Sequence, residues 1–313
     1  MKIVFLDVKT IGEVPNLNLL EAYGEVIYYQ TTTPDQTLTR IKEADVVITN
    51  KVVLDAATIQ AAPNLKLICV AATGTNNIDK AAAATRNIPV KNAVDYSSAS
   101  VAQLTFALLL QLIHNIPYFD NYVKQGAYAQ SSIFTHLGKT FWQIQDKRYG
   151  IIGMGNIGRQ VAAIAKAFGA EVVYFSTSGK NNDQPYQRLE LTEFLRTSDI
   201  ISIHAPLNEH TANLLYYDRL QLMKKTAVLI NVGRGGIINE ADLARALDED
   251  LIAGAGLDVF EQEPIKADNP LLHLKNKDKL ILTPHIAWAS VEARTLLIEK
   301  VSKHIEEFAG LVK

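Results

Sequence analysis

Several features that define other protein classes are missing from this 313-residue sequence. It contains one cysteine, Cys69, which excludes an internal disulfide framework and a zinc site built from cysteines, and which suits a reducing cytoplasm. Charge of neither sign is in excess, because 31 Lys and Arg residues stand against 33 Asp and Glu residues, so no nucleic-acid partner is indicated. The longest apolar run, Leu104–Ile113, is too short to span a bilayer.

The amino terminus also lacks the pattern of a signal peptide, since Met1 leads directly into the strand-like KIVFLD. Hydrophobic residues make up 48% of the chain and charged residues 20%, which is the composition of a soluble globular protein. We therefore expect a cytoplasmic protein with neither a nucleic-acid nor a membrane partner, long enough for two domains.

Two series of short apolar runs, each alternating with helix-like stretches, account for most of the chain. The first has strand-like runs at 2–6, 25–29, 45–49 and 65–70. The second has six, at 148–153, 171–175, 199–204, 227–232, 251–259 and 280–284. Such alternation predicts βαβ units and parallel sheets. The predicted fold class is α/β, with two doubly wound domains of the Rossmann-like or flavodoxin-like kind and a cleft between them.

The second series opens with GIIGMGNIG, residues 150–158. The spacing Gly153-x-Gly155-x-x-Gly158 between a strand and a helix is typical of dinucleotide-binding turns. Gly155 would let the backbone approach a pyrophosphate, and the amino terminus of the following helix would present free N–H groups to the phosphates. The pattern therefore predicts a bound dinucleotide.

The identity of that dinucleotide stays open in the sequence. A Rossmann strand of this kind normally ends in an acid that binds the adenosine ribose, and Ser176 occupies that position here. Hydroxyls and the nearby Lys180 can accept a 2′-phosphate that a carboxylate would repel, but no arginine stands there to clamp it. Either NAD or NADP is compatible with these residues.

Three polar side chains follow strands of the second series: Arg234 in NVGRGG, Glu263 in GLDVFEQEP and His285 in TPHIAWAS. Interconversion of a 2-keto acid and a 2-hydroxy acid needs such a set. An arginine can bind the substrate carboxylate and polarise the keto oxygen, and a histidine can transfer the hydroxyl proton. A nearby glutamate would favour the protonated histidine. We expect no metal ion in this site.

The remaining six histidines are interpreted as structural, although His204 ends a strand of the second series and could line the cofactor cleft. The loop AATGTNNID, residues 71–79, contains Thr73 and Gly74 after the fourth strand of the first series, and its residues alone favour an ordinary turn.

The stretch 117–144 is rich in aromatic residues and irregular in pattern. Exposed aromatics at this density indicate a partner surface, most simply a second copy of the chain. Packing of the segment against its own chain is the alternative. The helix-like stretch before it, from Ser98 to about His114, is apolar on most sides and should be buried.

Taken together and in order, these motifs resemble the D-isomer-specific 2-hydroxyacid dehydrogenase family, and within it the glycerate dehydrogenase/hydroxypyruvate reductase group. The resemblance covers nearly the whole chain. It is carried by ATGTNNID, SVAQLTFALLL, GIIGMGNIG, HAPLNEHT, INVGRGGIINEADLARAL, GLDVFEQEP and TPHIAWAS.

The resemblance implies roles for individual residues. Arg234 would bind and orient the substrate, Glu263 would hold His285, and His285 would be the general acid/base. Thr73 and Gly74 would supply backbone donors to the substrate carboxylate, so that loop becomes part of the predicted site. The implied cofactor positions, besides the glycines, are Thr105, Asn156, Ile157, Ser176, Pro206, Val232, Gly233 and Asp258, of which Asp258 would face the nicotinamide carboxamide.

The resemblance also implies an organisation. Residues 1–97 and 288–313 would form a discontinuous substrate domain, and 98–287 would form the dinucleotide-binding domain. Segment 117–144 would be the arm of a homodimer. Because the chain ends at Lys313 without the added regulatory domain of many phosphoglycerate dehydrogenases, phosphoglycerate is a less favoured substrate.

The predicted activity is reversible reduction of a small 2-keto acid by NADH or NADPH to the D-2-hydroxy acid, with hydroxypyruvate or glyoxylate favoured. Two alternatives remain at this stage: a D-lactate dehydrogenase acting on pyruvate, and a non-catalytic nucleotide-sensing protein like the corepressors that share this fold. Neither the particular acid nor the physiological direction follows from the sequence.

Overall fold

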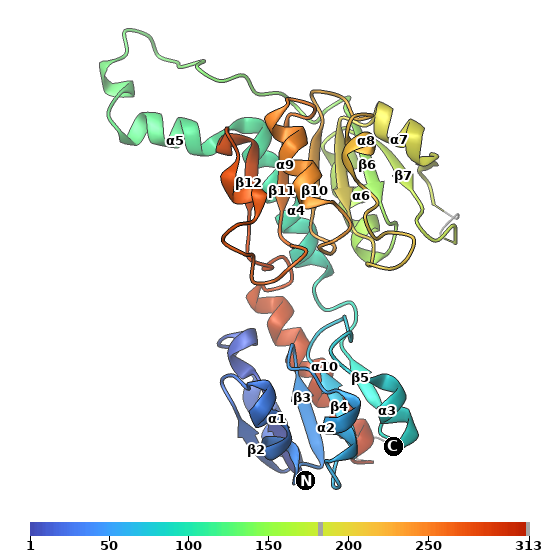
Figure 1. The fold of residues 1–313 in the computed structure, drawn as a ribbon. Helices are drawn as coiled ribbons and strands as arrows, with labels where there is room; N and C mark the ends of the chain where they lie inside the picture. Colours follow the sequence, from blue (N-terminus) through green and yellow to red (C-terminus); the bar gives the residue numbers. More distant parts are fainter. Residues whose placement is uncertain (181–183, 311–313) are drawn as a thin grey trace. The chain divides into compact units, whose positions relative to one another are not determined.

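The computed structural model describes residues 1–180 and 184–310 (Figure 1). The chain forms two compact units: unit 1 is Met1–Ser97 with the segment that starts at Trp288, and unit 2 is Ser98–Ala287. Each unit contains a parallel sheet of its own. The predicted α/β class with two parallel sheets is confirmed.

Unit 1 has five strands in the order β2-β1-β3-β4-β5. They are β1 Lys2–Phe5, β2 Glu25–Tyr28, β3 Val46–Thr49, β4 Leu67–Val70 and β5 Val90–Asn92. Its helices are α1 Pro34–Ile41, α2 Ala56–Gln60, α3 Lys80–Thr85 and α10 Val291–Phe308, with 3₁₀ turns η1 Val8–Ile11 and η2 Leu17–Tyr23. The sequence pattern does not reveal β5, because this three-residue strand, VKN, has a lysine at its centre.

Both faces of the unit 1 sheet are covered. Along β1, Ile3 and Phe5 pack into one core cluster and Val4 packs into the other. Strands β3 and β4 are buried at every position, which explains why VVIT and LICV are continuous rather than alternating apolar runs. The carboxyl-terminal helix α10 covers one face with Leu297, Ile298, Val301 and Ile305. A segment from the far end of the sequence therefore completes this core.

Unit 2 has seven strands in the order β12-β11-β10-β9-β6-β7-β8. They are β6 Arg148–Ile152, β7 Glu171–Phe175, β8 Gln187–Arg188, β9 Ile200–Ile203, β10 Val228–Asn231, β11 Gly254–Leu257 and β12 Leu280–Leu282. The strand order reverses between β6 and β9, and ligands of such sheets bind outside the carboxyl ends of the strands at that point. The two-residue edge strand β8 is too short and polar to be predicted.

The helices of unit 2 are α4 Ser98–His114, α5 Ile116–Lys124, α6 Asn156–Ala167, α7 Leu191–Thr197, α8 Tyr217–Leu220 and α9 Glu240–Asp248, with 3₁₀ turns η3 Tyr128–Gln130, η4 Pro270–His273 and η5 Lys277–Lys279. As its composition predicts, α4 is largely buried, and it packs against α6, β10 and β11. Within the described ranges no single helix is long and apolar enough to cross a bilayer; α4 and α5 reach that length and composition only as a pair bent by 61°.

The segment from α5 to residue 144, called the arm below, extends away from the sheet of unit 2 (Figure 1, green). Its rings contact one another: those of Tyr122 and His136 stack with centroids 3.7 Å apart, and the Tyr118 hydroxyl lies 2.8 Å from Nε2 of His136. Other large apolar side chains of the arm are exposed, above all Phe134 at 89% and Leu137 at 76%. The arm therefore has internal order but leaves apolar surface uncovered.

Candidate active site

The glycine turn between β6 and α6 is shaped by close backbone contacts. Gly153 has a φ of 93°, and a Cβ there would lie 2.9 Å from the Ala205 nitrogen. A Cβ on Gly158 would lie 2.2 Å from the Gly153 carbonyl oxygen, so only glycine lets α6 start this close to the turn. A Cβ on Gly155 would meet nothing within 4 Å. The backbone is thus closely packed at Gly153 and Gly158 but has open space at Gly155, as a phosphate-binding turn requires.

The amino terminus of α6 has the properties of an anion site. Gly155 is its N-cap, so the N-cap residue has no side chain with which to cap the helix. Arg159 folds back toward the turn, where its Nη1 donates to the Met154 carbonyl oxygen at 3.3 Å. The helix dipole and this guanidinium both favour negative charge at the turn. Sequence reasoning missed Arg159; its position directly after Gly158 is the signal that could have identified it.

Ser176 lies at the end of β7, the strand next to β6. The neighbouring Phe175 carbonyl oxygen accepts a hydrogen bond from the Gly153 nitrogen at 3.1 Å, which joins the end of β7 to the glycine turn. Ser176 itself is nearly buried, while Ser178 and Lys180 are exposed. The segment from Ser176 to Lys180 therefore contains hydroxyls and an ammonium group but no carboxylate.

The other predicted cofactor residues have differing environments. Thr105 is fully buried in α4, and its hydroxyl donates to the Val101 carbonyl oxygen at 2.8 Å, so it is turned into its own helix. Val232 is buried directly after β10, whereas Pro206 after β9 is exposed. The remaining members, Asn156, Ile157 and Gly233, lie at the start of α6 and after β10 and are exposed or half-buried.

His204 directly follows β9, beside the glycine turn. Its nitrogen donates to the Ile152 carbonyl oxygen at 2.8 Å, and its Nε2 lies 2.8 Å from the Ser202 hydroxyl. Within the described residues its buried Nδ1 has no hydrogen-bond partner. Burial lowers the pKa of His204 to about 3, so this imidazole is neutral at physiological pH.

His285 and Glu263 form a close pair on neighbouring loops. Nδ1 of His285 lies 2.7 Å from Oε2 of Glu263, and the other carboxylate oxygen accepts the backbone N–H of Phe260 at 3.1 Å. Glu263 is thereby oriented by its own loop, and it in turn orients the imidazole ring. His285 is half-buried, with 23% of its side chain exposed, while Glu263 is an exposed residue with 33% of its side chain accessible. Nε2 is the ring nitrogen left for a reacting group.

The loop that carries His285 is held by Asp258. This fully buried carboxylate accepts the Ile286 N–H at 2.9 Å, the Ala287 N–H at 2.8 Å and the Thr283 hydroxyl at 2.6 Å. Burial raises the pKa of the Asp258 carboxyl, and these hydrogen bonds oppose that rise. In this structure, then, both Asp258 oxygens bind the 283–287 loop; contact with a nicotinamide remains a prediction.

Arg234 lies in the loop after β10. Asn231 shapes this loop, because its side chain accepts the Gly233 N–H at 3.0 Å and donates to the Arg234 carbonyl oxygen at 3.0 Å. The loop rests on the one that carries Glu263: a Cβ on Gly235 would lie 1.8 Å from the Phe260 carbonyl oxygen. The fold of unit 2 thus brings the loops of Arg234, Glu263 and His285 together at the carboxyl ends of β10, β11 and β12.

Thr73 and Gly74 lie in unit 1, in the loop that follows β4. The Thr73 carbonyl oxygen accepts a hydrogen bond from the Asn92 side chain at 2.6 Å, and Thr73 is exposed while Gly74 is half-buried. This loop lies at the carboxyl edge of its own sheet, where α/β proteins bind ligands.

Comparison with known proteins gives concordant results. Residues 106–287 match the family described as D-isomer specific 2-hydroxyacid dehydrogenase, NAD binding domain. Glycerate dehydrogenase of Methylorubrum extorquens is 37% identical over 310 residues, covering 99% of this chain and 96% of its own. Hydroxypyruvate reductase of Blautia hydrogenotrophica is 37% identical over 296 residues, covering 92% and 90% respectively. A solved structure of an acyclic imino acid reductase in complex with NADPH and D-Arg superposes with a TM-score of 0.87 at 32% identity, covering 99% of this chain and 98% of that chain.

Proposed function

The chain belongs to the D-isomer-specific 2-hydroxyacid dehydrogenase family, and on that premise we propose that it reduces hydroxypyruvate or glyoxylate to the D-2-hydroxy acid with NADH or NADPH, His285 being the general acid. Relatives named glycerate dehydrogenase and hydroxypyruvate reductase support this choice of substrate. The observation that carries the proposal is the His285–Glu263 pair, 2.7 Å apart, on a loop anchored by a buried carboxylate.

In the proposed reaction, Arg234 binds the substrate carboxylate and polarises the keto oxygen, and Thr73 and Gly74 offer backbone N–H groups to the same carboxylate. A nicotinamide bound at the glycine turn would be the source of the hydride that the keto carbon accepts. Nε2 of His285 gives its proton to the keto oxygen, so the C=O bond becomes a CH–OH group. Glu263 binds Nδ1 of His285 and holds the ring in place. The reverse sequence oxidises the hydroxy acid.

The glycine turn fits the cofactor. The open space at Gly155 and the amino terminus of α6, whose N-cap is this glycine, suit a pyrophosphate, and Arg159 adds positive charge beside it. Ser176 and the residues after it would contact the adenosine ribose or its 2′-phosphate, and both NAD and NADP remain candidates.

The proposed function is tested by following NADH and NADPH oxidation with hydroxypyruvate, glyoxylate and pyruvate, using the wild-type protein and His285→Gln. Turnover should be fastest with hydroxypyruvate or glyoxylate. The His285→Gln variant should lose about two to four orders of magnitude in kcat, because the proton donor is gone, while NADH still binds. Near-normal turnover of that variant would remove His285 from the mechanism.

The same panel separates the two alternatives. Preferential turnover of pyruvate would indicate a D-lactate dehydrogenase. Binding of NADH without oxidation by any keto acid would indicate a nucleotide-sensing protein instead.

We further propose that the protein is a homodimer held by the arm. Exposed apolar side chains on a segment that projects from its unit need a covering surface, and a second copy of the chain is the simplest source of that surface.

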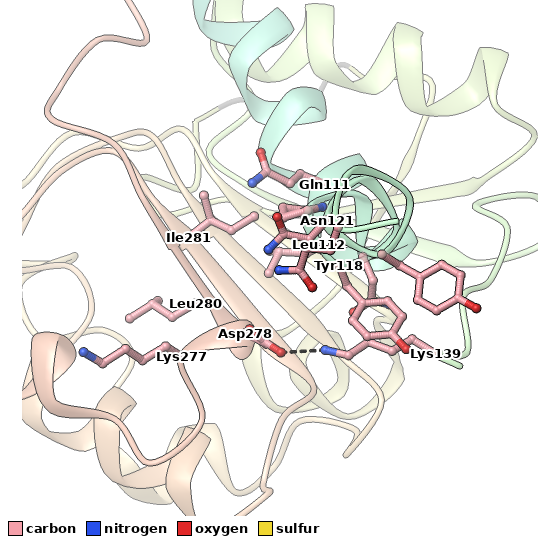
Figure 2. Close-up of a pocket in the computed structure, with 13 residues that line it drawn as sticks. Gln111, Leu112, Tyr118, Asn121, Lys139, Lys277, Asp278, Leu280 and Ile281 are labelled. Carbon is pink, nitrogen blue, oxygen red and sulfur yellow. Dashed lines mark hydrogen bonds and ion pairs between the residues drawn. The ribbon is translucent and has the colours of Figure 1, made fainter. Parts of the chain in front are cut away.

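A cavity of about 520 Å³ lies between α4, α5, β12 and η5 at the base of the arm (Figure 2). Tyr118 and Asn121 of α5 line it opposite Leu280 and Ile281, and the Lys139–Asp278 ion pair, 2.6 Å long, joins the returning arm to η5. The cavity provides a groove in which the partner can pack.

A further inference from the structure

Asp7, two residues after the end of β1, is a buried carboxylate that binds a neighbouring loop. It is 3% exposed. Its oxygens accept the backbone N–H groups of three successive residues: Asn50 at 2.9 Å, Lys51 at 2.7 Å and Val52 at 3.3 Å. The Asn50 side chain donates to the Thr10 hydroxyl at 3.0 Å, and that hydroxyl donates to the Asp7 carbonyl oxygen at 2.7 Å. Asp7 therefore determines the path of the chain after β3.

Burying this carboxylate is unfavourable in itself. Burial raises the pKa of the Asp7 carboxyl, and the N–H groups of Asn50, Lys51 and Val52 oppose the rise. The arrangement parallels that of unit 2, where buried Asp258 accepts successive N–H groups from the loop that carries His285. In both units a buried carboxylate near the carboxyl end of a strand holds a loop by accepting hydrogen bonds from the backbone N–H groups of that loop.

The loop held by Asp7, residues 50–54, is joined to the loop that contains Thr73 and Gly74. The Asn77 side chain donates to the Val52 carbonyl oxygen at 2.9 Å. The Leu54 N–H donates to the Asn77 carbonyl oxygen at 2.8 Å, and Leu54 pairs with Ile78 as an isolated β-bridge. The two loops are therefore directly hydrogen-bonded to each other.

Packing alone does not hold residues 50–54. Lys51, Val52 and Val53 line a cavity of about 520 Å³ that also borders Asp7 and the start of α1. Leu54 is buried in the core of unit 1, whereas residues 51–53 border this cavity, so the hydrogen bonds that Asp7 and Asn77 make to the loop contribute to its position.

We propose that Asp7 is a positioning residue for the substrate: it holds residues 50–54 and, through Asn77, sets the backbone donors at Thr73 and Gly74. This inference rests on the proposed function, which assigns those donors to the substrate carboxylate.

The test compares Asp7→Asn with Asp55→Asn. Asp55 belongs to the same unit, but it is exposed and its carboxylate caps α2 by accepting the Thr58 N–H. Asp7→Asn should raise KM for hydroxypyruvate by roughly ten- to hundredfold with a smaller loss of kcat. The dissociation constant for NADH should not change. Asp55→Asn should leave KM for hydroxypyruvate unchanged.

Asn77→Ala removes the side-chain hydrogen bond to the Val52 carbonyl oxygen and so interrupts the same connection. Because Asn77 is only half-buried, this variant can replace Asp7→Asn as the test if Asp7→Asn does not fold. It should also raise KM for hydroxypyruvate, and its effect should not add to that of Asp7→Asn in the double variant, since both act through one connection. If the two substitutions have additive effects on KM for hydroxypyruvate, or if a folded Asp7→Asn variant has an unchanged KM, Asp7 stabilises the fold but does not position the substrate.

Hydrogen exchange tests the same connection without any activity. Backbone amides of residues 71–79 should exchange faster in Asp7→Asn than in the wild type or Asp55→Asn. Unchanged exchange in that segment would overturn the inference. Absence of keto-acid reduction by the wild type would instead overturn the proposed function, and with it the substrate role of the loop.

Discussion

His285 has a left-handed backbone, with a φ of 55°. For a residue with a Cβ this conformation costs roughly 1–3 kcal/mol. The surrounding hydrogen bonds compensate for it, because the His285 N–H donates to the Asp258 carbonyl oxygen at 2.8 Å while the Asp258 carboxylate accepts the next two N–H groups. The orientation of the proposed proton donor therefore depends on a residue that need not touch the substrate.

Ser176 is the residue at which cofactor choice can be tested. Ser176→Asp introduces a negative charge beside the expected 2′-phosphate, so the ratio of kcat/KM for NADPH to that for NADH should fall by about tenfold or more. Ser176→Ala is the matched control, because it removes the hydroxyl without adding charge and should change the ratio much less. An unchanged ratio in Ser176→Asp would mean that the residue does not govern selectivity.

His204 should make the fold sensitive to acid. In the folded chain its pKa is about 3, against an ordinary value of 6.5, so below pH 6.5 the unfolded state binds a proton that the folded state does not. The free energy of unfolding should therefore fall as pH decreases, by about 2 kcal/mol at pH 5 from this residue alone.

Denaturant unfolding at pH 7 and pH 5 measures this effect. His204→Asn should reduce the difference in unfolding free energy between the two pH values. His210→Asn changes a largely exposed histidine and should leave the difference as it is in the wild type. Equal pH dependence in all three proteins would contradict a neutral buried His204.

Among the secondary-structure elements, the turn from β6 into α6 requires glycine at Gly153 and Gly158. Gly158 is required for contact between the helix and the turn, whereas Gly155 has free space around it. The two positions therefore separate the stability of the fold from the affinity for the cofactor.

Gly155→Ala should fold normally, because the backbone at Gly155, with φ of −81° and ψ of −163°, suits any residue. It should weaken NADH binding about tenfold or more, since the added methyl group occupies the space proposed for the pyrophosphate. Gly158→Ala should lose stability as well, by about 1–3 kcal/mol, because its Cβ would overlap the Gly153 carbonyl oxygen. Thermal melting and NADH titration measure the two effects; normal NADH affinity in Gly155→Ala would exclude this turn as the phosphate site.

At the scale of the whole molecule, the arm contains the two large apolar side chains with the highest exposure among the described residues, Phe134 and Leu137. Its ring contacts order it internally, yet the side chains of Phe134 and Leu137 face outward. Apolar groups arranged in this way usually belong to an interface between subunits.

The combined change Phe134→Asp and Leu137→Asp should therefore convert the proposed dimer into monomers, because charged side chains in an apolar interface lose solvation without gaining partners. Light scattering at several protein concentrations measures the mass. Leu19→Asp, which alters an exposed apolar residue of unit 1, should leave the mass unchanged. A wild-type protein that is already monomeric would disprove the dimer proposal.

The sequence by itself determined the α/β class, the glycine turn and the residue types available for chemistry. These are properties of short segments: buried parallel strands are continuous apolar runs, and the glycine spacing reflects contacts within one strand–turn–helix unit. It did not reveal β5 or β8, because those edge strands are short and polar and depend on a neighbouring strand for their hydrogen bonds.

Only the tertiary structure decided what Asp7 and Asp258 do. Asp7 binds residues about 43 positions away, and Asp258 binds residues up to 29 positions away. Each contact exists because parallel strands bring their carboxyl ends to one edge of a sheet, where loops distant in sequence become neighbours. The sequence pattern singled out Asp258 as a cofactor position and gave no role to Asp7, whereas in the fold the oxygens of both carboxylates accept backbone N–H groups.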